Sequence, residues 1–94
     1  MAYCVELTPA ARGDLAALPD RIRRQVARRI EALAANPRSP QCKMLVQWDS
    51  IFRVRSGDYR ILYQIHDEKL LVLVIRIGHR RQIYRNVSGK KRPQ

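Results

Sequence analysis

Residues 52–63 of this 94-residue chain read FRVRSGDYRILY, a pattern that predicts two strands joined by a tight turn. Phe52 and Val54 alternate with Arg53 and Arg55, as expected for a strand with one buried face. In the Ser-Gly-Asp that follows, glycine supplies a positive φ and the flanking side chains can bond to their own backbone. The stretch therefore predicts a β-hairpin with its apolar side chains on one face.

Two registers fit this hairpin. A four-residue connection sets Val54 opposite Tyr59 and Arg53 opposite Arg60, and it gathers the apolar side chains on one face. A three-residue connection separates the arginines but places Arg53 beside Ile61. We favour the first register, although two like charges directly opposite each other cost roughly 0.2–1 kcal/mol. Facing arginines suggest that an anionic group lies over that face.

The segments before the hairpin predict a strand followed by two helices. Residues 2–7 alternate as a short strand, and Thr8-Pro9 is typical of a helix start with threonine as the N-cap. Apolar side chains then recur at helical spacing on both sides of Pro19: Ala11, Leu15 and Leu18, then Ile22, Val26, Ile30 and Leu33. Two amphipathic helices need a sheet against which to bury their apolar stripes.

A central strand is predicted at residues 70–77, LLVLVIRI, because a nearly continuous apolar run is typical of a strand covered on both faces. Residues 44–46 either pack in the core or begin another strand. We therefore predict an α+β fold of order β-α-α-β-β-β, a small antiparallel-rich sheet with an N-terminal helical hairpin packed on one face. Residues 1–86 are expected to form a single domain and residues 87–94 a basic, flexible tail.

The net charge of +11 is unevenly distributed, with +3 on residues 1–50 and +8 on residues 51–94. This balance indicates a polyanionic or acidic partner. Arginine makes up 15 of the 19 basic residues, and its planar fork suits phosphate, although genomic composition bias would produce the same ratio. The arginines of the second helix are expected to form a solvated face that could also contact RNA or an acidic protein: Arg21, Arg23, Arg24, Arg28 and Arg29.

Several classes of protein are excluded. No run approaches the ~18 apolar residues of a membrane span, and the N-terminus lacks the features of a signal peptide, so a cytoplasmic location without membrane contact is expected. Cys4 and Cys42 lack metal-ligand spacing, and Cys4 is expected to be a small core hydrophobe. No metal or cofactor is predicted.

The segment after the central strand, GHRRQIY at residues 78–84, carries candidate catalytic residues. Arg80 and Tyr84 are four residues apart and share a face in either a strand or a helix. Together with Arg53 and Arg60 they would form a cationic surface with one aromatic ring. Such a surface suits metal-free RNA cleavage, since guanidinium groups stabilise charge on the phosphorane oxygens and a tyrosine stacks on an unpaired base. Further candidate RNA-binding residues are Arg55, His79, Arg81 and Arg85.

Simpler structural roles remain open for the same residues. Arg53 and Arg55 could be ordinary solvated strand residues, and Tyr84 could anchor the C-terminal segment by packing. Arg60 could pair with Asp58 or Glu68.

The runs FRVRSGDYRILYQI and LLVLVIRIGHRRQIYR resemble the RelE-like toxins of bacterial and archaeal toxin–antitoxin pairs, over about residues 2–85. The resemblance implies the RelE/ParE-like fold and cleavage of mRNA in the ribosomal A site. By position it implies that Arg60 stabilises the phosphate, Arg80 acts as general acid and Tyr84 orients the substrate. It also implies a cognate antitoxin with an acidic, amphipathic binding segment, and with it a toxin–antitoxin hetero-oligomer.

The chain departs from this family on the first hairpin strand. The best-understood members have lysines there, one of them the proposed general base, whereas this chain has Arg53 and Arg55. Arginine stays protonated and is a poor base. His79 could accept a proton, but after an extended strand it would point away from Arg80.

Two other functions stay open. One is a non-catalytic ParE-type toxin that inhibits DNA gyrase by binding, and the other is a plain RNA-binding module. The GHRR-x-x-Y segment together with Arg60 favours the ribonuclease, because ParE-like chains generally lack that set of residues.

Overall fold

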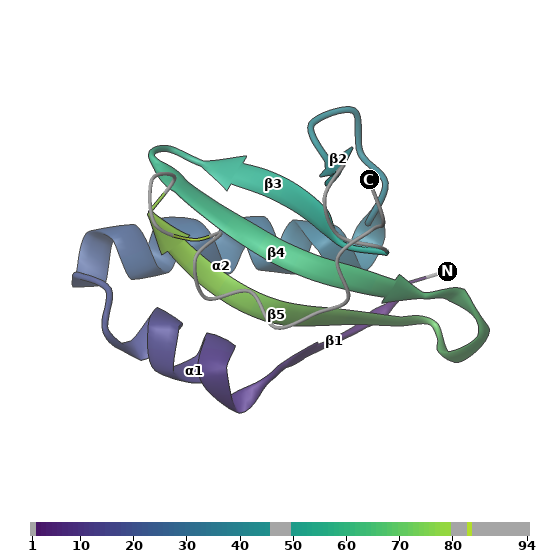
Figure 1. Cartoon of the computed structure of the whole chain (residues 1–94), viewed down its shortest axis with the longest axis horizontal. Helices are drawn as coiled ribbons and strands as arrows, with labels where there is room; N and C mark the ends of the chain where they lie inside the picture. Colours follow the sequence, from purple (N-terminus) through teal and green to yellow (C-terminus); the bar gives the residue numbers. More distant parts are fainter. Residues whose placement is uncertain (1, 46–49, 80–82, 84–94) are drawn as a thin grey trace, which may run out of the picture.

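The computed structural model describes residues 2–45, 50–79 and 83, in which two helices pack against a five-stranded sheet (Figure 1). In chain order the elements are β1 (Cys4–Leu7), α1 (Pro9–Ala16), α2 (Asp20–Ala35), β2 (Lys43–Met44), β3 (Phe52–Ser56), β4 (Tyr59–His66), the 3-10 turn η1 (Asp67–Lys69) and β5 (Leu71–His79). The strand order is β1-β5-β4-β3-β2, with β1 parallel to β5 and the other neighbours antiparallel. The predicted α+β fold is confirmed, and the short β2 is the strand left open at residues 44–46.

Both helices begin as the sequence predicts. The Thr8 hydroxyl accepts a hydrogen bond from the Ala11 backbone N–H at 3.1 Å, and Pro9 occupies the first turn of α1. Pro19 precedes α2, and Asp20 lies in the first turn of that helix, where a negative charge is favourable. In Figure 1, α2 passes behind the sheet. The predicted apolar stripes of both helices therefore face the sheet.

The main core lies between the helices and the sheet. Its buried members are Ala11, Val26, Ile30, Leu33, Val54, Ile61, Tyr63, Val72, Val74 and Ile77. A smaller second cluster covers part of the opposite, open face and contains Leu45, Ile51, Leu62 and Ile83, with Ile75 packed against it. The middle of β4 is consequently buried on both faces. The strand predicted to be central, β5, is likewise an interior strand with apolar contacts on both sides.

The β3–β4 hairpin has a shorter turn than either predicted register. Only Gly57 and Asp58 form the loop, and Val54 lies opposite Ile61 while Arg55 lies opposite Arg60. Gly57 has φ +60°, as a two-residue type II′ turn requires, and this turn matches the twist of the flanking strands. Both predicted registers were wrong. The favoured one is off by two residues, which keeps every side chain on its predicted face.

A β-bulge interrupts the pairing of β4 with β5. Leu62 lies opposite Arg76 and Tyr63 lies opposite Val74, so Ile75 is the extra residue. Val74 and Ile77 remain in the main core, while Ile75 packs against the second cluster. The bulge therefore allows one strand to serve both clusters.

Helix α1 covers the edge of β5 beyond the end of β1. The Asp14 carboxylate accepts hydrogen bonds from the Ile77 backbone N–H at 3.0 Å and from the Arg76 guanidinium at 2.9 and 3.0 Å. Tyr3, Val5 and Leu7 on and beside β1 pack on the main core. Cys4 alternates with them and is exposed, so the prediction that it packs in the core was wrong. Across the described residues, no helix has the length and apolar character to cross a membrane.

Candidate functional site

Three arginines lie on the face of the sheet that the helices leave open. Val54 and Ile61 point into the main core, and successive side chains of a strand point to opposite faces. Arg53, Arg55 and Arg60 therefore share the open face, with Arg55 directly opposite Arg60. Facing arginines were predicted on this face, but the partner of Arg60 is Arg55 and not Arg53.

These arginines line a groove of about 420 Å³, here called the arginine groove. Its lining residues are Arg29, Pro40, Gln41, Lys43, Arg53, Arg55 and Arg60. They come from α2, the loop after it, and three strands. No acidic side chain is found among the described residues that line it. The arginine groove thus gathers five cationic groups around a space suited to an anion.

The short β2 explains how a helix and the open face reach the same groove. β2 pairs only with Phe52 and Arg53, so β3 is a sheet edge from Val54 onward. The loop and α2 meet beside this edge, where the Arg29 guanidinium donates a hydrogen bond to Gln41 Oε1 at 2.8 Å. This bond links α2 to the loop and fixes Arg29 at the rim of the groove.

The Arg60 guanidinium is oriented by the hairpin turn. Its Nη1 lies 3.4 Å from the Gly57 carbonyl oxygen and 3.3 Å from the Tyr59 carbonyl oxygen. Both distances are long for an N–H···O bond. A phosphate would offer the same group shorter, charge-assisted bonds. The two carbonyl contacts therefore orient the Arg60 side chain, but they are longer than the hydrogen bonds that a phosphate could make with it.

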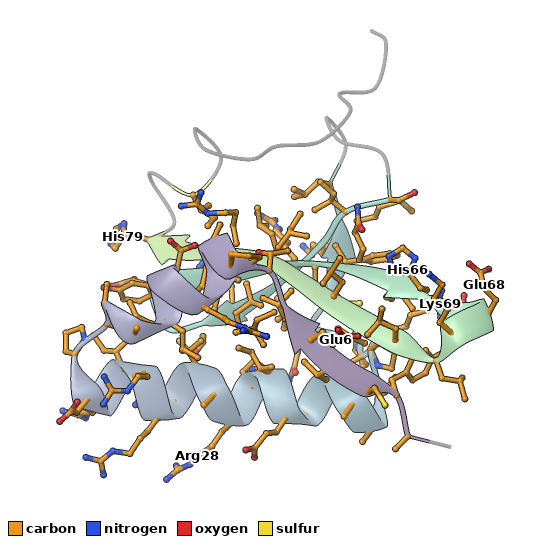
Figure 2. All side chains as sticks on the ribbon, turned by 90° about the horizontal axis from the view of Figure 1, so that it is seen from below. Glu6, Arg28, His66, Glu68, Lys69 and His79 are labelled. Carbon is orange, nitrogen blue, oxygen red and sulfur yellow. The ribbon has the colours of Figure 1, made fainter. Side chains whose placement is uncertain are left out.

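His79 is separated from the three arginines of the open face. Its ring packs edge-to-face on Tyr59, with the ring centroids 5.7 Å apart at an angle of 81°. Tyr59 packs against the main core, which places this pair on the helix side of the sheet. Figure 2 shows His79 at the end of β5, far from the turn that carries Glu68 and Lys69. The structure does not bring His79 together with the groove.

Gly78 lies opposite Arg60 and next to Ile83. A Cβ added at Gly78 would lie 2.9 Å from the Cδ1 atom of Ile83, and Ile83 is buried in the second cluster. Ile83 itself therefore lies on the open face, close to the residue opposite Arg60. The other predicted site residues of this segment, Arg80, Arg81, Tyr84 and Arg85, lie outside the described residues, as does the tail at 87–94.

The site residues predicted from the sequence did not include Arg29 and Lys43, which line the arginine groove. Arg29 carries the same pattern as its exposed helical neighbours, so only the folded loop shows that it reaches the sheet edge. Lys43 belongs to a two-residue strand, which is too short to show a period. Elsewhere in the described part of the chain, no three His, Cys, Asp or Glu side chains cluster as metal ligands would, and metal independence stays a prediction.

A second polar cluster lies at a different place on the molecule and ties three segments together. The Arg38 guanidinium donates to both Asp67 carboxylate oxygens, at 3.0 and 2.8 Å, and the Tyr3 hydroxyl donates to Asp67 Oδ1 at 2.7 Å. These bonds lower the pKa of Asp67 from 3.8 to about 2, with the Arg38 bond as the largest cause. None of the three residues lines the arginine groove, which indicates a structural role.

Comparison with known proteins gives consistent matches over most of the chain. Residues 5–84 match the family described as ParE toxin of type II toxin-antitoxin system, parDE. The chain is 37% identical to Toxin RelG of Mycobacterium tuberculosis over 86 residues, which cover 90% of this chain and 99% of the relative. It is 31% identical to mRNA interferase toxin RelE of Escherichia coli K12 over 81 residues, which cover 85% of each.

Solved structures agree with these sequence matches. The toxin–antitoxin complex RelBE2 from M. tuberculosis contains a chain that superposes with a TM-score of 0.75 at 35% identity, covering 84% of this chain and 99% of that one. The isolated E. coli RelE toxin superposes with a TM-score of 0.73 at 28% identity, covering 83% of this chain and 84% of that one. The similarity therefore extends over the helices and the sheet together.

Proposed function

Given that this chain is a RelE-like member of the ParE toxin family of type II toxin–antitoxin systems, we propose that it arrests growth by cleaving mRNA on the ribosome. The observation that carries this proposal is the arginine groove. Its five cations converge from four elements on one concave space, and the facing pair Arg55 and Arg60 lies in it. Two like charges held opposite each other are unfavourable unless an anion lies between them. A phosphodiester is such an anion.

The reaction that fits this groove is attack of a ribose 2′-oxygen on the adjacent phosphorus. The new 2′-O–P bond forms as the P–O5′ bond breaks, which gives a 2′,3′-cyclic phosphate and a 5′-hydroxyl. Negative charge builds on the non-bridging oxygens in the transition state. Arg60, assisted by Arg53 and Arg55, stabilises that charge through paired N–H···O bonds.

Two protons also move in this reaction, one from the 2′-hydroxyl and one to the 5′-oxygen. Arginine stays protonated, so the groove contributes charge stabilisation and the proton acceptor lies beyond its arginines. A group of the ribosome is the acceptor we favour. The family resemblance assigns proton donation to Arg80 and substrate orientation to Tyr84. Both are near Ile83 in the sequence, and Ile83 lies against Gly78, the residue opposite Arg60.

The proposed partner that silences the toxin is an antitoxin. The similar M. tuberculosis structure is a toxin–antitoxin complex, and the net charge of +11 favours an acidic binding segment. We propose an amphipathic antitoxin segment, a toxin–antitoxin hetero-oligomer and a cytoplasmic location, where ribosomes are found.

A second function is favoured by the family description itself, which names a ParE toxin. In that case the chain would inhibit DNA gyrase by binding, and the groove would contact the gyrase–DNA assembly without catalysis. The named relative mRNA interferase toxin RelE favours cleavage instead.

The test is to incubate the full chain with ribosomes programmed with a defined mRNA and to analyse the fragment ends. We expect cuts that leave a 2′,3′-cyclic phosphate and a 5′-hydroxyl. Fragments with 5′-phosphate ends would contradict the proposed reaction. Intact mRNA together with inhibited gyrase supercoiling would instead assign the chain to the second function.

A further inference from the structure

The arginine groove does not end at the sheet. A second hollow of about 470 Å³ lies between α2 and the β3–β4 turn and shares Arg29 with the groove. A third hollow of about 420 Å³ lies along α2 and shares Gln25 and Arg28 with the second. The three hollows therefore adjoin one another in a row from the open face, past the hairpin turn, and along the helix; this row is here called the path.

This path is lined by cations over its whole length. Arg21, Arg24, Arg28 and Arg29 of α2 line the outer two hollows, here called the α2 tract, and the groove adds the four cations of the sheet. Among the described lining residues, none is acidic. Figure 2 shows Arg28 on the outer side of α2, pointing away from the sheet. A soluble helix face usually mixes both signs of charge, and the carboxylates of α2, Asp20 and Glu31, do not line these hollows.

The ion pairs between described residues do not involve the four arginines of the α2 tract. They join Arg23 to Asp20, Arg38 to Asp67 and Arg76 to Asp14. None of these three arginines lines the hollows; the Arg23 pair lies within α2, and the other two pairs join different segments. The carboxylate partners thus go to arginines outside the α2 tract.

We propose that the α2 tract binds the sugar-phosphate backbone of an RNA strand that continues from the arginine groove, an inference that rests on the proposed function. Arginine forks match phosphate oxygens in pairs. The outer hollows add polar groups that also suit a backbone, namely the Gln25 amide and the Ser56 hydroxyl. Contacts of this kind position a strand and carry no sequence information.

An acidic protein segment is the weaker fit. Protein partners are held by large apolar or aromatic anchors in buried pockets, and an amphipathic helix needs an apolar groove for its apolar face. Among the described residues that line the outer hollows, Ala32 is the only apolar side chain. Met44 is the large hydrophobic side chain that stands exposed in the described chain, and it does not line the path.

The test measures binding of a single-stranded 2′-O-methyl RNA, which lacks the nucleophile for cleavage, to the full chain over a range of KCl concentrations. The tract variant is Arg24→Ala/Arg28→Ala. The control is Arg12→Ala/Lys69→Ala, which removes the same net charge from exposed positions off the path. The four residues changed in the two double variants are exposed, so circular dichroism should show that both variants fold like the wild type.

The tract variant should lower the slope of log K against log [KCl] by about 1.4, because each phosphate contact on a single strand contributes about 0.7. The control should keep the wild-type slope. Equal slopes in the two double variants would overturn the proposal, since only net charge would then matter. Weakened binding of poly-L-glutamate with an unchanged RNA slope would also overturn it and assign the tract to an acidic polypeptide.

This experiment separates the two proposals. Loss of slope in the tract variant without mRNA cleavage by the wild type would support the tract and reject the ribonuclease. Cleavage by the wild type with no slope change in the tract variant would support the ribonuclease and reject RNA binding by the tract.

Discussion

At the scale of single residues, Tyr63 shows how the core accommodates a polar atom. Its side chain is fully buried, and its hydroxyl donates a hydrogen bond to the Pro37 carbonyl oxygen at 2.7 Å. Burial raises the pKa of the Tyr63 phenol well above its usual value, so the group stays neutral. The alternating pattern of β4 predicts the burial. The acceptor lies in a loop 26 residues away in sequence, and no local pattern identifies it.

Replacing Tyr63 by phenylalanine should lower the free energy of unfolding by about 1 kcal/mol, because the buried Pro37 carbonyl loses its donor while the ring remains. Urea denaturation measures the change. Tyr3→Phe is the matched control, since it removes an exposed hydroxyl bond to Asp67 and should cost less. A Tyr63→Phe variant as stable as wild type would show that the bond contributes nothing net.

At the scale of elements, the β3–β4 turn decides which residues face each other. The sequence patterns predict the faces of both strands correctly, because alternation depends only on local order. They do not predict the register, because Ser56 and Asp58 fit several turn lengths. The two-residue turn centred on Gly57 sets Arg55 against Arg60 and so shapes the arginine groove.

Replacing glycine by alanine should destabilise the fold at one position and stabilise it at another. Gly57 has φ +60° with open space around its Cα, so Gly57→Ala should destabilise the fold by about 1 kcal/mol through backbone strain alone. Gly13 lies inside α1 with equally open space, so Gly13→Ala should stabilise the fold by about 0.5–1 kcal/mol. Thermal unfolding of both variants checks the signs. Equal changes in the unfolding temperature of the two variants would contradict the type II′ turn assigned at Gly57.

The cluster of Arg38, Asp67 and Tyr3 makes stability depend on pH in the acid range. The pKa of Asp67 is lowered from 3.8 to about 2 in the folded protein, so its contribution is fully present above about pH 4 and is lost as the pH falls toward 2. Asp67→Asn removes this dependence. Between pH 5 and 2.5, the urea midpoint of wild type should fall further than that of Asp67→Asn. If the urea midpoints of the two proteins fell equally over this pH range, the lowered pKa of Asp67 would be contradicted.

At the scale of the whole molecule, cations from four elements gather along one path. Asp67 and Glu68 lie on the turn after β4, whereas the cations of the groove and the α2 tract occupy this path on α2, β2, β3 and β4. Sequence patterns predict the fold class, the family and the arginines of the sheet. Sequence patterns do not predict that Arg29 and Lys43 join those arginines. Helix α2, strand β2 and strand β3 come together only when the loop between α2 and β2 folds against the edge of β3.

The rate of mRNA cleavage by Arg60→Ala on programmed ribosomes tests directly whether the arginine groove is catalytic. Losing one preorganised donor to a developing oxyanion should slow cleavage by about 10²–10³. Arg60→Lys should recover only part of the rate, because an ammonium cannot make the paired contact. Arg60 faces away from the main core, so the variant should keep its fold. Arg12→Ala, off the groove, should cleave at the wild-type rate. A folded Arg60→Ala protein that cleaves mRNA at the wild-type rate would contradict the proposed role of Arg60 in stabilising the transition state.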